Sequence, residues 1–536
     1  NKGDLVYYYN RYLCAEVKKK GGNNKKMNDS LSKTWLQYEA GKDYKRRIGL
    51  YATVRQNERF YRGDQWYMME SGGLPRPVFN IVKRVADYLI CSVVPERVDI
   101  TYRSDVVAYG NKEAASRLAS LLSANAKYRW ERSKMGSKLY KLAMDAVISG
   151  DGVLYSYWRG DAAGDGIYEG DIETELIDNV NLFVSDVNKS DIQSQDYVIL
   201  AGRASVISLR REARANGVSE KELGKIVPDR LDDSERSGDH ASIELEGDDE
   251  AKATYLIKFW REEGKVCFEK STRNCVINKV KTPCTLYPVA YFNWHPTKNS
   301  FHGTSAVAGM IANQKYVNRA YAMVMKHMGD TAFSKVIYDK SKIPEWSNEV
   351  GEAIAAIGGT NVSDAVAVLG VGKLQDGYLD FLSNVISTAK EVNGATETAL
   401  GNVTPENTSA ILAVQEASKI PLKLVRAAFY RCIEELASIW ADMTLAYFPS
   451  DRFIPMLDGN GVLTSERISV NEEEKTSFKA FIDVTDTSVF TPSITLSILD
   501  NLLQGGHITI EQYLERLPEG YITDKASLIR GGAANG

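Results

Sequence analysis

The sequence is poor in the residues that metal and disulfide chemistry require. Its 536 residues include five histidines and six cysteines. The cysteines are widely spaced and match neither a CxxC pair nor a zinc-ribbon pattern, standing at Cys14, Cys91, Cys267, Cys275, Cys284 and Cys432. His295 and His302 are separated by a proline and a loop-like stretch, which favours loop packing over metal ligation. We therefore expect reduced thiols and neither a metal nor any other cofactor.

A surplus of basic residues and a long apolar run are also missing. Lys and Arg number 66 against 70 Asp and Glu, which gives a formal net charge of −4 and a pI near 6.0. Proteins that bind nucleic acid tightly usually carry an excess of Lys and Arg, and the overall composition shows no such excess. No apolar stretch approaches the roughly 18–20 residues of a membrane span, and the first residues lack the apolar core of a signal peptide. We expect a soluble protein of a reducing compartment, with no membrane partner.

Familiar catalytic motifs are absent as well. The chain contains no GxxxxGK[ST] phosphate loop, no GxSxG elbow and no HExxH helix. The acidic stretch 228–252 does not match an EF-hand loop, so a solvated insertion is favoured there over a cation site. Cys432 falls in the apolar stripe of a helical segment, where a cysteine ordinarily packs as a small hydrophobe. The sequence thus predicts a protein that is not an enzyme.

The patterns that are present indicate a folded protein of the α+β class, mainly helical. The composition is 44% hydrophobic and 25% charged, and a chain of this length should form two to four domains. Helical periodicity covers residues 32–61, 78–94 and 111–148. Strand-like runs occur at residues 153–158, 172–177, 197–201, 254–260 and 266–270.

The central region contains a long helix, a small insertion and a returning helix. Apolar residues recur at three-to-four spacing over residues 303–328, and a helix of about 26 residues would be ~39 Å long. Strand-like residues 333–338 and 365–371 flank a short helical pattern at 344–357, which begins at a proline and ends at two glycines. Residues 378–392 are helical again. The sequence therefore predicts a β-α-β module inserted between two helices.

A long loop and another long helix follow. Residues 391–412 read EVNGATETALGNVTPENTSAIL and contain neither Lys nor Arg. Connections between helices usually run about 2–8 residues, so a longer loop is either functional or a mobile surface segment. Residues 409–448 show helical periodicity, and Pro421 within them predicts a kink because proline removes a backbone hydrogen bond.

The order of these parts resembles the core of a tailed-bacteriophage portal protein, the head-to-tail connector. Local residues agree, and they are closest in pattern to portals of short-tailed phages. FYRGDQW at 60–66 and RPVFN at 76–80 resemble the N-terminal pattern of those portals. FHGTS at 301–305, together with Asn313, Gln314 and Asn318, resembles the entry to the first stem helix. Residues 396–402 and the following SAILAVQEASKIPLKL resemble the tunnel loop and the helix behind it. The resemblance spans roughly residues 55 to 450.

The resemblance implies a portal-type division of the chain. It consists of a flexible N-terminal arm (1–29), the N-terminal part of a wing (30–302), a first stem helix (303–328), a clip (329–377), a second stem helix (378–392), a tunnel loop (393–408), a long kinked helix with the rest of the wing (409–490) and a crown (491–536). The amphipathic helical pattern of HITIEQYLERLPEGYITDKASLI suits the crown.

The same resemblance implies a function and a set of partners. Portals form a dodecameric ring at one capsid vertex and conduct double-stranded DNA non-specifically during packaging and ejection. The implied partners are other copies of the chain, the large subunit of the terminase motor, the head-tail adaptor or tail proteins, and the major capsid and scaffolding proteins. The protein would belong to the virion and would assemble in the cytoplasm of the host bacterium.

The tunnel loop that the resemblance implies would explain the absence of cations in residues 393–408. Moving DNA must not be held, and each phosphate paired with Lys or Arg adds affinity. Thr396, Thr398 and Asn402 could touch phosphates weakly without reading sequence. Glu397 and Glu406 would repel DNA. The remaining channel candidates are Asn393 and Gly394.

The stem and the clip supply further candidates. On the first stem helix, Lys315, Arg319 and Lys326 should lie off the apolar stripe and face solvent, the capsid or the channel. In the clip, the candidates for docking the terminase and the adaptor are Lys340, Lys342, Trp346 and Glu349. An exposed Trp346 would be a good anchor, although a tryptophan could equally form the core of a small module.

Two rival hypotheses remain. The chain could be another ring component of the virion, such as a head-tail adaptor, although such chains often lack a helix-insertion-helix core. A more remote alternative is a metal-dependent nuclease that uses Asp248 and Asp249, for which the sequence offers no partner residues.

Overall fold

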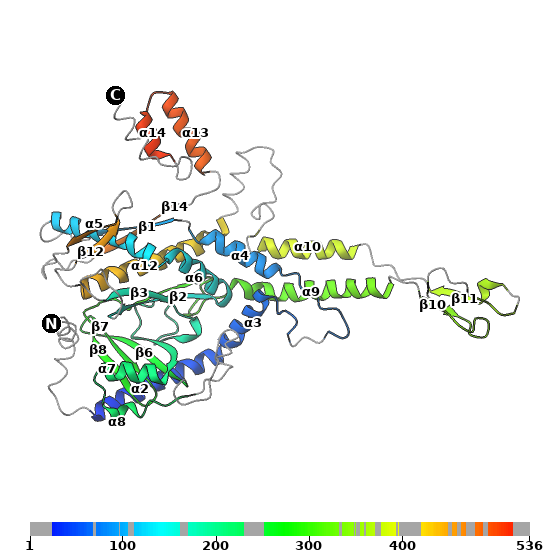
Figure 1. Cartoon of the computed structure of the whole chain (residues 1–536), viewed down its shortest axis with the longest axis horizontal. Coiled ribbons are helices and arrows are strands. Elements are labelled where there is room, and N and C mark those ends of the chain that lie inside the picture. Colours follow the sequence, from blue (N-terminus) through cyan, green and yellow to red (C-terminus); the bar gives the residue numbers. More distant parts are fainter. Residues whose placement is uncertain are drawn as a thin grey trace.

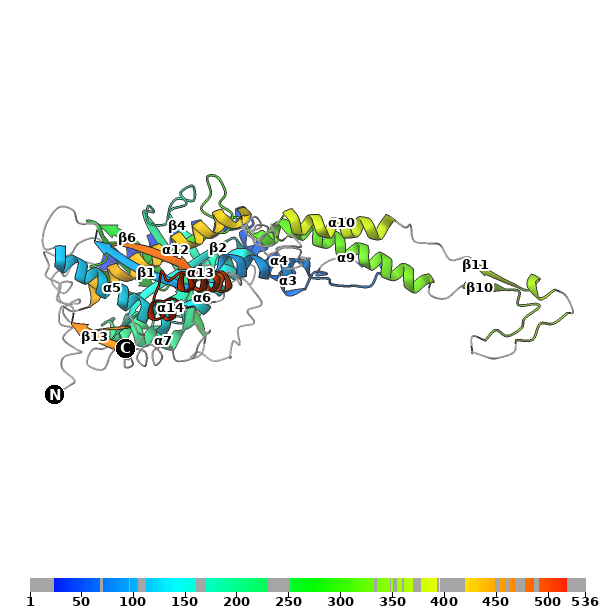
Figure 2. The same ribbon diagram turned by 90° about the horizontal axis from the view of Figure 1, so that it is seen from above.

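The computed structural model is a mixed α+β body from which a pair of long helices projects (Figures 1 and 2). The structure describes residues 24–67, 71–95, 97–104, 112–160, 170–229, 251–331, 335–347, 349, 354–358, 361–369, 377–392, 395, 420–448, 453–457, 463–467, 478–485 and 491–517. The predicted fold class is therefore confirmed at the level of α+β, and the arrangement of the parts is described below.

Two helical stretches that the sequence predicts as continuous are each divided in two. The helices that the structure describes in the N-terminal part are α2 (Asn24–Arg47), α3 (Leu50–Arg62), α4 (Ile81–Val93), α5 (Lys112–Arg132) and α6 (Met135–Ser149). Gly49 separates α2 from α3 with a φ of 69°, and Lys134 separates α5 from α6 with a φ of 52°. Left-handed backbone cannot continue a right-handed helix. Apolar periodicity carries no signal of such a break, least of all at a lysine.

The body contains two main antiparallel sheets. The larger has the order β4 (Leu182–Val184), β5 (Tyr197–Ser205), β6 (Lys252–Glu262), β7 (Lys265–Ser271) and β8 (Val276–Lys281). The smaller has the order β3 (Asp171–Leu176), β2 (Asp151–Arg159) and β9 (Val289–Asn293). Two further helices, α7 (Val206–Ala215) and α8 (Glu220–Leu223), share a small apolar core with the larger sheet. The strand-like runs predicted from the sequence are present as β2, β3, β5, β6 and β7.

The C-terminal part crosses back over the body. Its elements are α12 (Lys423–Tyr447), β12 (Phe453–Leu457), β13 (Leu463–Arg467), β14 (Phe478–Thr485), α13 (Thr491–Gln504) and α14 (Ile510–Arg516). Strand β14 pairs with β1 (Arg97–Ser104), far away in sequence, and β12 pairs with β13. The predicted 409–448 helix is described from residue 420 onward, where Pro421 lies in a 3-10 turn (Ile420–Leu422) directly before α12.

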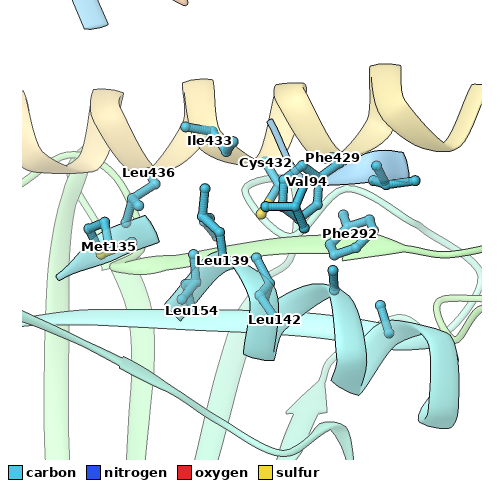
Figure 3. Close-up of a cluster of buried hydrophobic side chains, with 14 of the residues drawn as sticks. Val94, Met135, Leu139, Leu142, Leu154, Phe292, Phe429, Cys432, Ile433 and Leu436 are labelled. Carbon is cyan, nitrogen blue, oxygen red and sulfur yellow. The ribbon is translucent and has the colours of Figure 1, made fainter. Parts of the chain in front are cut away.

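The main core lies between α12, α6 and the smaller sheet (Figure 3). Phe429, Ile433 and Leu436 of α12 point toward Leu139 of α6 and Phe292 of β9. The Phe429 and Phe292 rings meet edge to face, with their centroids 5.3 Å apart. Cys432 is buried in this stripe, as the sequence predicts. The core therefore joins α12 to elements that lie far earlier in the chain.

The projection consists of α9 (Ala306–Thr331) and α10 (Gly377–Val392), which lie side by side in both views. At its far end, β10 (Lys335–Tyr338) and β11 (Val366–Leu369) form an antiparallel hairpin. The predicted helix at 344–357 is wrong for the residues that can be judged, since 344–347, 349 and 354–357 are not helical. A helical crossover is needed between parallel strands, whereas antiparallel strands need none.

Phe429→Ala tests the packing of α12 on the body. The side chain is fully buried, so the substitution should lower the free energy of unfolding by about 3–5 kcal/mol through lost burial and a residual cavity. Leu424→Ala on the same helix is a matched control. Because Leu424 is 83% exposed, this substitution should change the free energy of unfolding by no more than about 0.5 kcal/mol. Denaturant unfolding of both variants measures the difference, and equal losses would contradict this packing.

Glu435 of α12 makes a buried polar contact in this same interface. Its carboxylate accepts hydrogen bonds from the Gln193 side chain at 3.2 Å and from the Tyr291 backbone amide at 3.3 Å. Burial raises the pKa of Glu435 to about 7, although these two bonds oppose the shift. The folded chain therefore holds a proton on Glu435 that the unfolded chain releases near its ordinary pKa of 4.5.

Stability should depend on pH through this group. A raised folded pKa contributes stability below the unfolded pKa, and the contribution is lost as pH rises toward 7. Relative to Glu435→Gln, the wild-type free energy of unfolding should fall by up to about 3 kcal/mol between about pH 4.5 and 7.5. Other buried acids, such as Asp145, are common to both proteins and cancel in the difference. A pH-independent difference between the two proteins would contradict the assignment.

Candidate functional site

The projecting helix pair is the feature of the fold that calls for a functional explanation. Apolar contacts of Val317 and Ala320 with Leu382 hold the two helices together near the body. Tyr316 and Phe381 meet edge to face with their centroids 6.4 Å apart. Farther out, the pair has solvent on most sides (Figure 1). A projection of this kind needs a firm root in the body, and two buried polar networks supply one.

The first network is centred on Asp151, at the start of β2. Its carboxylate accepts hydrogen bonds from the His302 ring at 2.6 Å, the Gly303 amide at 2.7 Å, and the side chains of Asn293 and Asn179 at 3.0 and 3.1 Å. Burial alone would raise the pKa of Asp151, but His302 and these donors hold it below its ordinary value. A buried carboxylate with four donors fixes the chain immediately before α9.

Close backbone approach reinforces this first network. A Cβ on Gly150 would lie 2.6 Å from the Gly303 carbonyl oxygen, and Gly150 has a φ of +101°. A Cβ on Gly303 would in turn lie 2.9 Å from the Gly150 carbonyl oxygen. The Ser305 hydroxyl then donates to the Val147 carbonyl at 2.9 Å. The FHGTS segment therefore serves to dock α9 against the end of α6.

Lys45 extends the first network to α2. Its ammonium donates to the carbonyls of Asn179, Val180 and Leu182 at 2.6–2.9 Å, and it lies 3.9 Å from the centroid of the Phe183 ring. Burial lowers the pKa of Lys45 to about 7, against the attraction of Asp178 and Asp151. Sequence analysis did not identify Lys45 or Asp151 as functional residues. The available signal was an aspartate between two glycines at the start of an apolar strand.

The second network joins α9 to the FYRGDQW and RPVFN segments. The Gln314 side chain accepts from the Ile81 amide at 3.0 Å and donates to the Phe79 carbonyl and to Asn318 Oδ1, both at 2.8 Å. Asn318 then donates to Gln65 Oε1 at 2.7 Å. Gln65 donates to Asn80 Oδ1 at 3.0 Å, while Asn80 also caps α4. The FYRGDQW and RPVFN segments are thus joined to α9 by one continuous set of hydrogen bonds.

Several of the predicted histidines and cysteines lie within the described residues, whereas Cys14 lies outside them. His302 belongs to the buried Asp151 network, and burial lowers the pKa of His295. Across the ranges that the structure describes, no group of His, Cys, Asp or Glu is arranged to hold a metal ion. Cys267, Cys275, Cys284 and Cys432 are buried free thiols, and Cys91 is an exposed one.

The outer surface of the projection is unusually apolar. Several large side chains of α9, α10 and the hairpin are 40–63% exposed, namely Tyr316, Met323, Met325, Met328, Leu379, Phe381, Ile337 and Val368. The predicted apolar stripe of α9 is buried at Val307, Met310 and Val317 but emerges into solvent at Met328. Large apolar side chains exposed in such number on one part of a fold are typical of an interaction site.

The three predicted stem cations differ in their surroundings. Lys315 is half-buried, with its ammonium 5.5 Å from the centroid of the Phe60 ring. Lys326 is exposed and pairs with Asp330 at 3.4 Å. Arg319 is exposed and has neither a hydrogen bond nor an ion pair within the described ranges. All three lie off the buried stripe.

The predicted clip residues lie beyond the hairpin strands. Trp346 is half-buried and stacks on Tyr338 of β10, with ring centroids 5.3 Å apart. Lys342 lies 3.8 Å from Asp339, and its ammonium donates to the Asp364 carbonyl at 3.3 Å. Lys340 and Glu349 are exposed. Trp346 therefore helps to build the module rather than standing free as an anchor.

Several predicted residues lie outside the described ranges. They are the tunnel-loop candidates Asn393, Gly394, Thr396, Glu397, Thr398, Asn402 and Glu406, together with Asp248 and Asp249. Within 393–408 the structure describes Ala395, which is buried and whose amide donates to the Lys390 carbonyl at 3.0 Å. The predicted roles of the others stay predictions.

Comparisons with known proteins add a remote structural likeness. No family model matches the chain, and no curated protein matches it. Among solved structures, it is similar to a chain in the neck of an empty GTA particle, computed with C6 symmetry. The identity is 11%, the match covers 89% of this chain and 93% of the other, and the TM-score is 0.36. A likeness of this size carries no argument about function. No helix in the described ranges could span a membrane.

Gln314→Leu tests the second network. The substitution keeps the size of the side chain but leaves the Ile81 amide and the Phe79 carbonyl without their partner. The free energy of unfolding should therefore fall by about 1–3 kcal/mol. Asn313→Leu is the matched control, because Asn313 is exposed on the same turn and should change stability by no more than about 0.5 kcal/mol. Equal effects of the two substitutions in thermal or denaturant unfolding would contradict the role of Gln314.

Proposed function

We propose that the chain is the portal protein of a tailed bacteriophage. Copies of it would form a dodecameric ring at a unique capsid vertex, through which double-stranded DNA passes during packaging and ejection. In this role the chain is a structural component of the virion rather than an enzyme. The observation that carries the proposal is the projecting pair α9–α10 with its distal hairpin β10–β11, rooted in the body by two buried networks.

The exposed surface of the projection supports assembly. A monomer in water would gain nothing from presenting Met323, Met328, Leu379 and Phe381 to solvent. Copies arranged side by side around an axis would bury those side chains against one another, at about 25 cal/mol per Å² of apolar surface. The projection would then form the stem of the ring, and the hairpin would form the clip.

The acidic composition fits a conduit better than a binder. A duplex that must slide through a ring should meet few cations, since each phosphate–cation contact adds affinity. We assign residues 393–408 to a loop that faces the channel, with Thr396, Thr398 and Asn402 touching phosphates and Glu397 and Glu406 repelling them. Exposed Lys340 and Glu349 beside the hairpin would meet the terminase and, later, the adaptor or tail.

The alternative proposal is another ring component of the virion, such as a head-tail adaptor. Such a component would also form a ring, but it would bind different partner proteins from those of a portal. The helix pair that leaves and re-enters the body favours a portal. The capsid and scaffolding proteins would be additional partners in either case.

Negative-stain imaging and native mass measurement of the purified full chain test the proposal. Closed rings with a central hole are expected, with a mass near twelve times the 59.6 kDa of one chain. Met323→Lys combined with Met328→Lys should abolish the rings by charging the projection, while Leu424→Lys on α12 should not. A stable dimer that hydrolyses DNA would contradict the proposal and favour the nuclease alternative.

A further inference from the structure

The helix pair presents two outer faces that point in opposite directions. Successive residues of an α-helix are rotated by about 100°, so a residue two positions from a packed one points about 160° away from it. Val317 of α9 and Leu382 of α10 pack against each other in one apolar cluster. Arg319 therefore points away from α10, and Asp380 points away from α9.

The two outer faces carry opposite charge. On the outer face of α9, Lys315, Arg319 and Lys326 outnumber the acidic Asp330. On the outer face of α10, the acidic residues Asp380 and Glu391 are both exposed, with Lys390 at the margin. Polar Asn384 and Thr388 complete the latter face and are also exposed. The pair is thus cationic on one side and acidic on the other.

Arg319 and Asp380 also lie at the same height along the projection. The two helices run antiparallel, because α9 leaves the body and α10 returns to it. Arg319 is two residues farther from the body than Val317, and Asp380 is two residues farther than Leu382. Each step adds about 1.5 Å, so both charges stand about 3 Å beyond the Val317–Leu382 contact.

Both charges are available to a partner. Arg319 and Asp380 are exposed, and neither has a hydrogen bond or ion pair within the ranges that the structure describes. They cannot pair with each other in one chain, since the two helices separate them. The other cations of the α9 face are engaged, Lys326 with Asp330 and Lys315 above the Phe60 ring.

We propose that the α9 face of one chain docks on the α10 face of a second copy, with Arg319 paired to Asp380 of the neighbouring subunit. This inference rests on the proposed ring and names the surfaces that build it. The two faces are different, so the contact is heterologous, and repetition of a heterologous contact closes a ring when the rotation between subunits permits. Equal heights keep the subunits level, which a ring around one axis requires.

The surface between these charges fits a helix as partner. Along α9, Ala312, Tyr316, Arg319, Met323 and Lys326 are exposed with alternating three- and four-residue spacing, and Tyr316 lies at the margin of this row, where it also meets Phe381 of α10. This spacing is the seam that a second helix follows when helices cross at a shallow angle. A Cβ on Gly309, at the base of the seam, would meet nothing within 4 Å, so this position is open in the single chain.

Charge reversal in the full chain tests the pairing. Arg319→Glu and Asp380→Lys should each raise the concentration needed for ring assembly by roughly tenfold or more, because every interface then opposes like charges. The double variant carries the wild-type net charge and should restore assembly. An equimolar mixture of the two single variants should also restore it. Subunits that alternate around the ring would then match the introduced glutamate with the introduced lysine at one interface and Arg319 with Asp380 at the next.

The outcomes separate this inference from the function on which it rests. Circular dichroism and thermal unfolding should show folded chains throughout, since both side chains are exposed. Wild-type rings with single variants that assemble normally would overturn the pairing and leave the ring intact. Single variants that fail while the double variant and the mixture also fail would overturn it too. A wild-type chain that forms no rings would count against the proposed function itself.

Discussion

The structure depends on one buried carboxylate, that of Asp151. It lies at the start of β2, directly after α6. Its four donors are His302 and Gly303 from the segment that enters α9, Asn293 at the end of β9, and Asn179 from the turn that follows β3. An isolated buried carboxylate would be costly, so its donors must stay in place together. The direction in which α9 leaves the body is therefore set by an electrostatic requirement of the core. The Gln314–Asn318–Gln65 network holds α9 to the body a second time, about two turns farther along the helix.

Much of the secondary structure follows from periodicity, and the failures have physical causes. The pattern of apolar residues predicts α9, α10 and strands β2, β5 and β6 to within a few residues of their observed bounds, and it predicts the C-terminal end of α12. It misses the breaks at Gly49 and Lys134 because a left-handed residue changes the direction of the chain without changing its hydrophobic spacing. It misses β14 because its partner β1 lies nearly 400 residues away, and pairing at that distance leaves no local signal. The helix at 344–357 is predicted only from the proline at its expected start and the two glycines after its expected end.

The candidate site was predictable in outline but not in its chemistry. The order of parts located the projection, and FYRGDQW, RPVFN and FHGTS marked its root. No spacing rule indicated that Gln314 and Asn318 bond to the segments around Gln65 and Ile81, because these contacts join residues more than two hundred positions apart. The same holds for Lys45, a polar residue in an ordinary surface pattern whose ammonium is fully enclosed. The role of a buried polar residue depends on its partners in the folded chain, and the sequence alone does not show which residues those partners are.

The chain leaves the body along α9 and returns to it along α10, and this arrangement has an evolutionary consequence. Since α9 and α10 run side by side, the chain returns near its point of departure whatever lies between Thr331 and Gly377. Lengthening such an excursion costs little free energy, because the entropy of closing a loop grows only with the logarithm of its length. The distal module can therefore be replaced, extended or trimmed without disturbing Asp151 or the core beneath α12. Selection acting on what the tip binds is uncoupled from selection acting on the stability of the body.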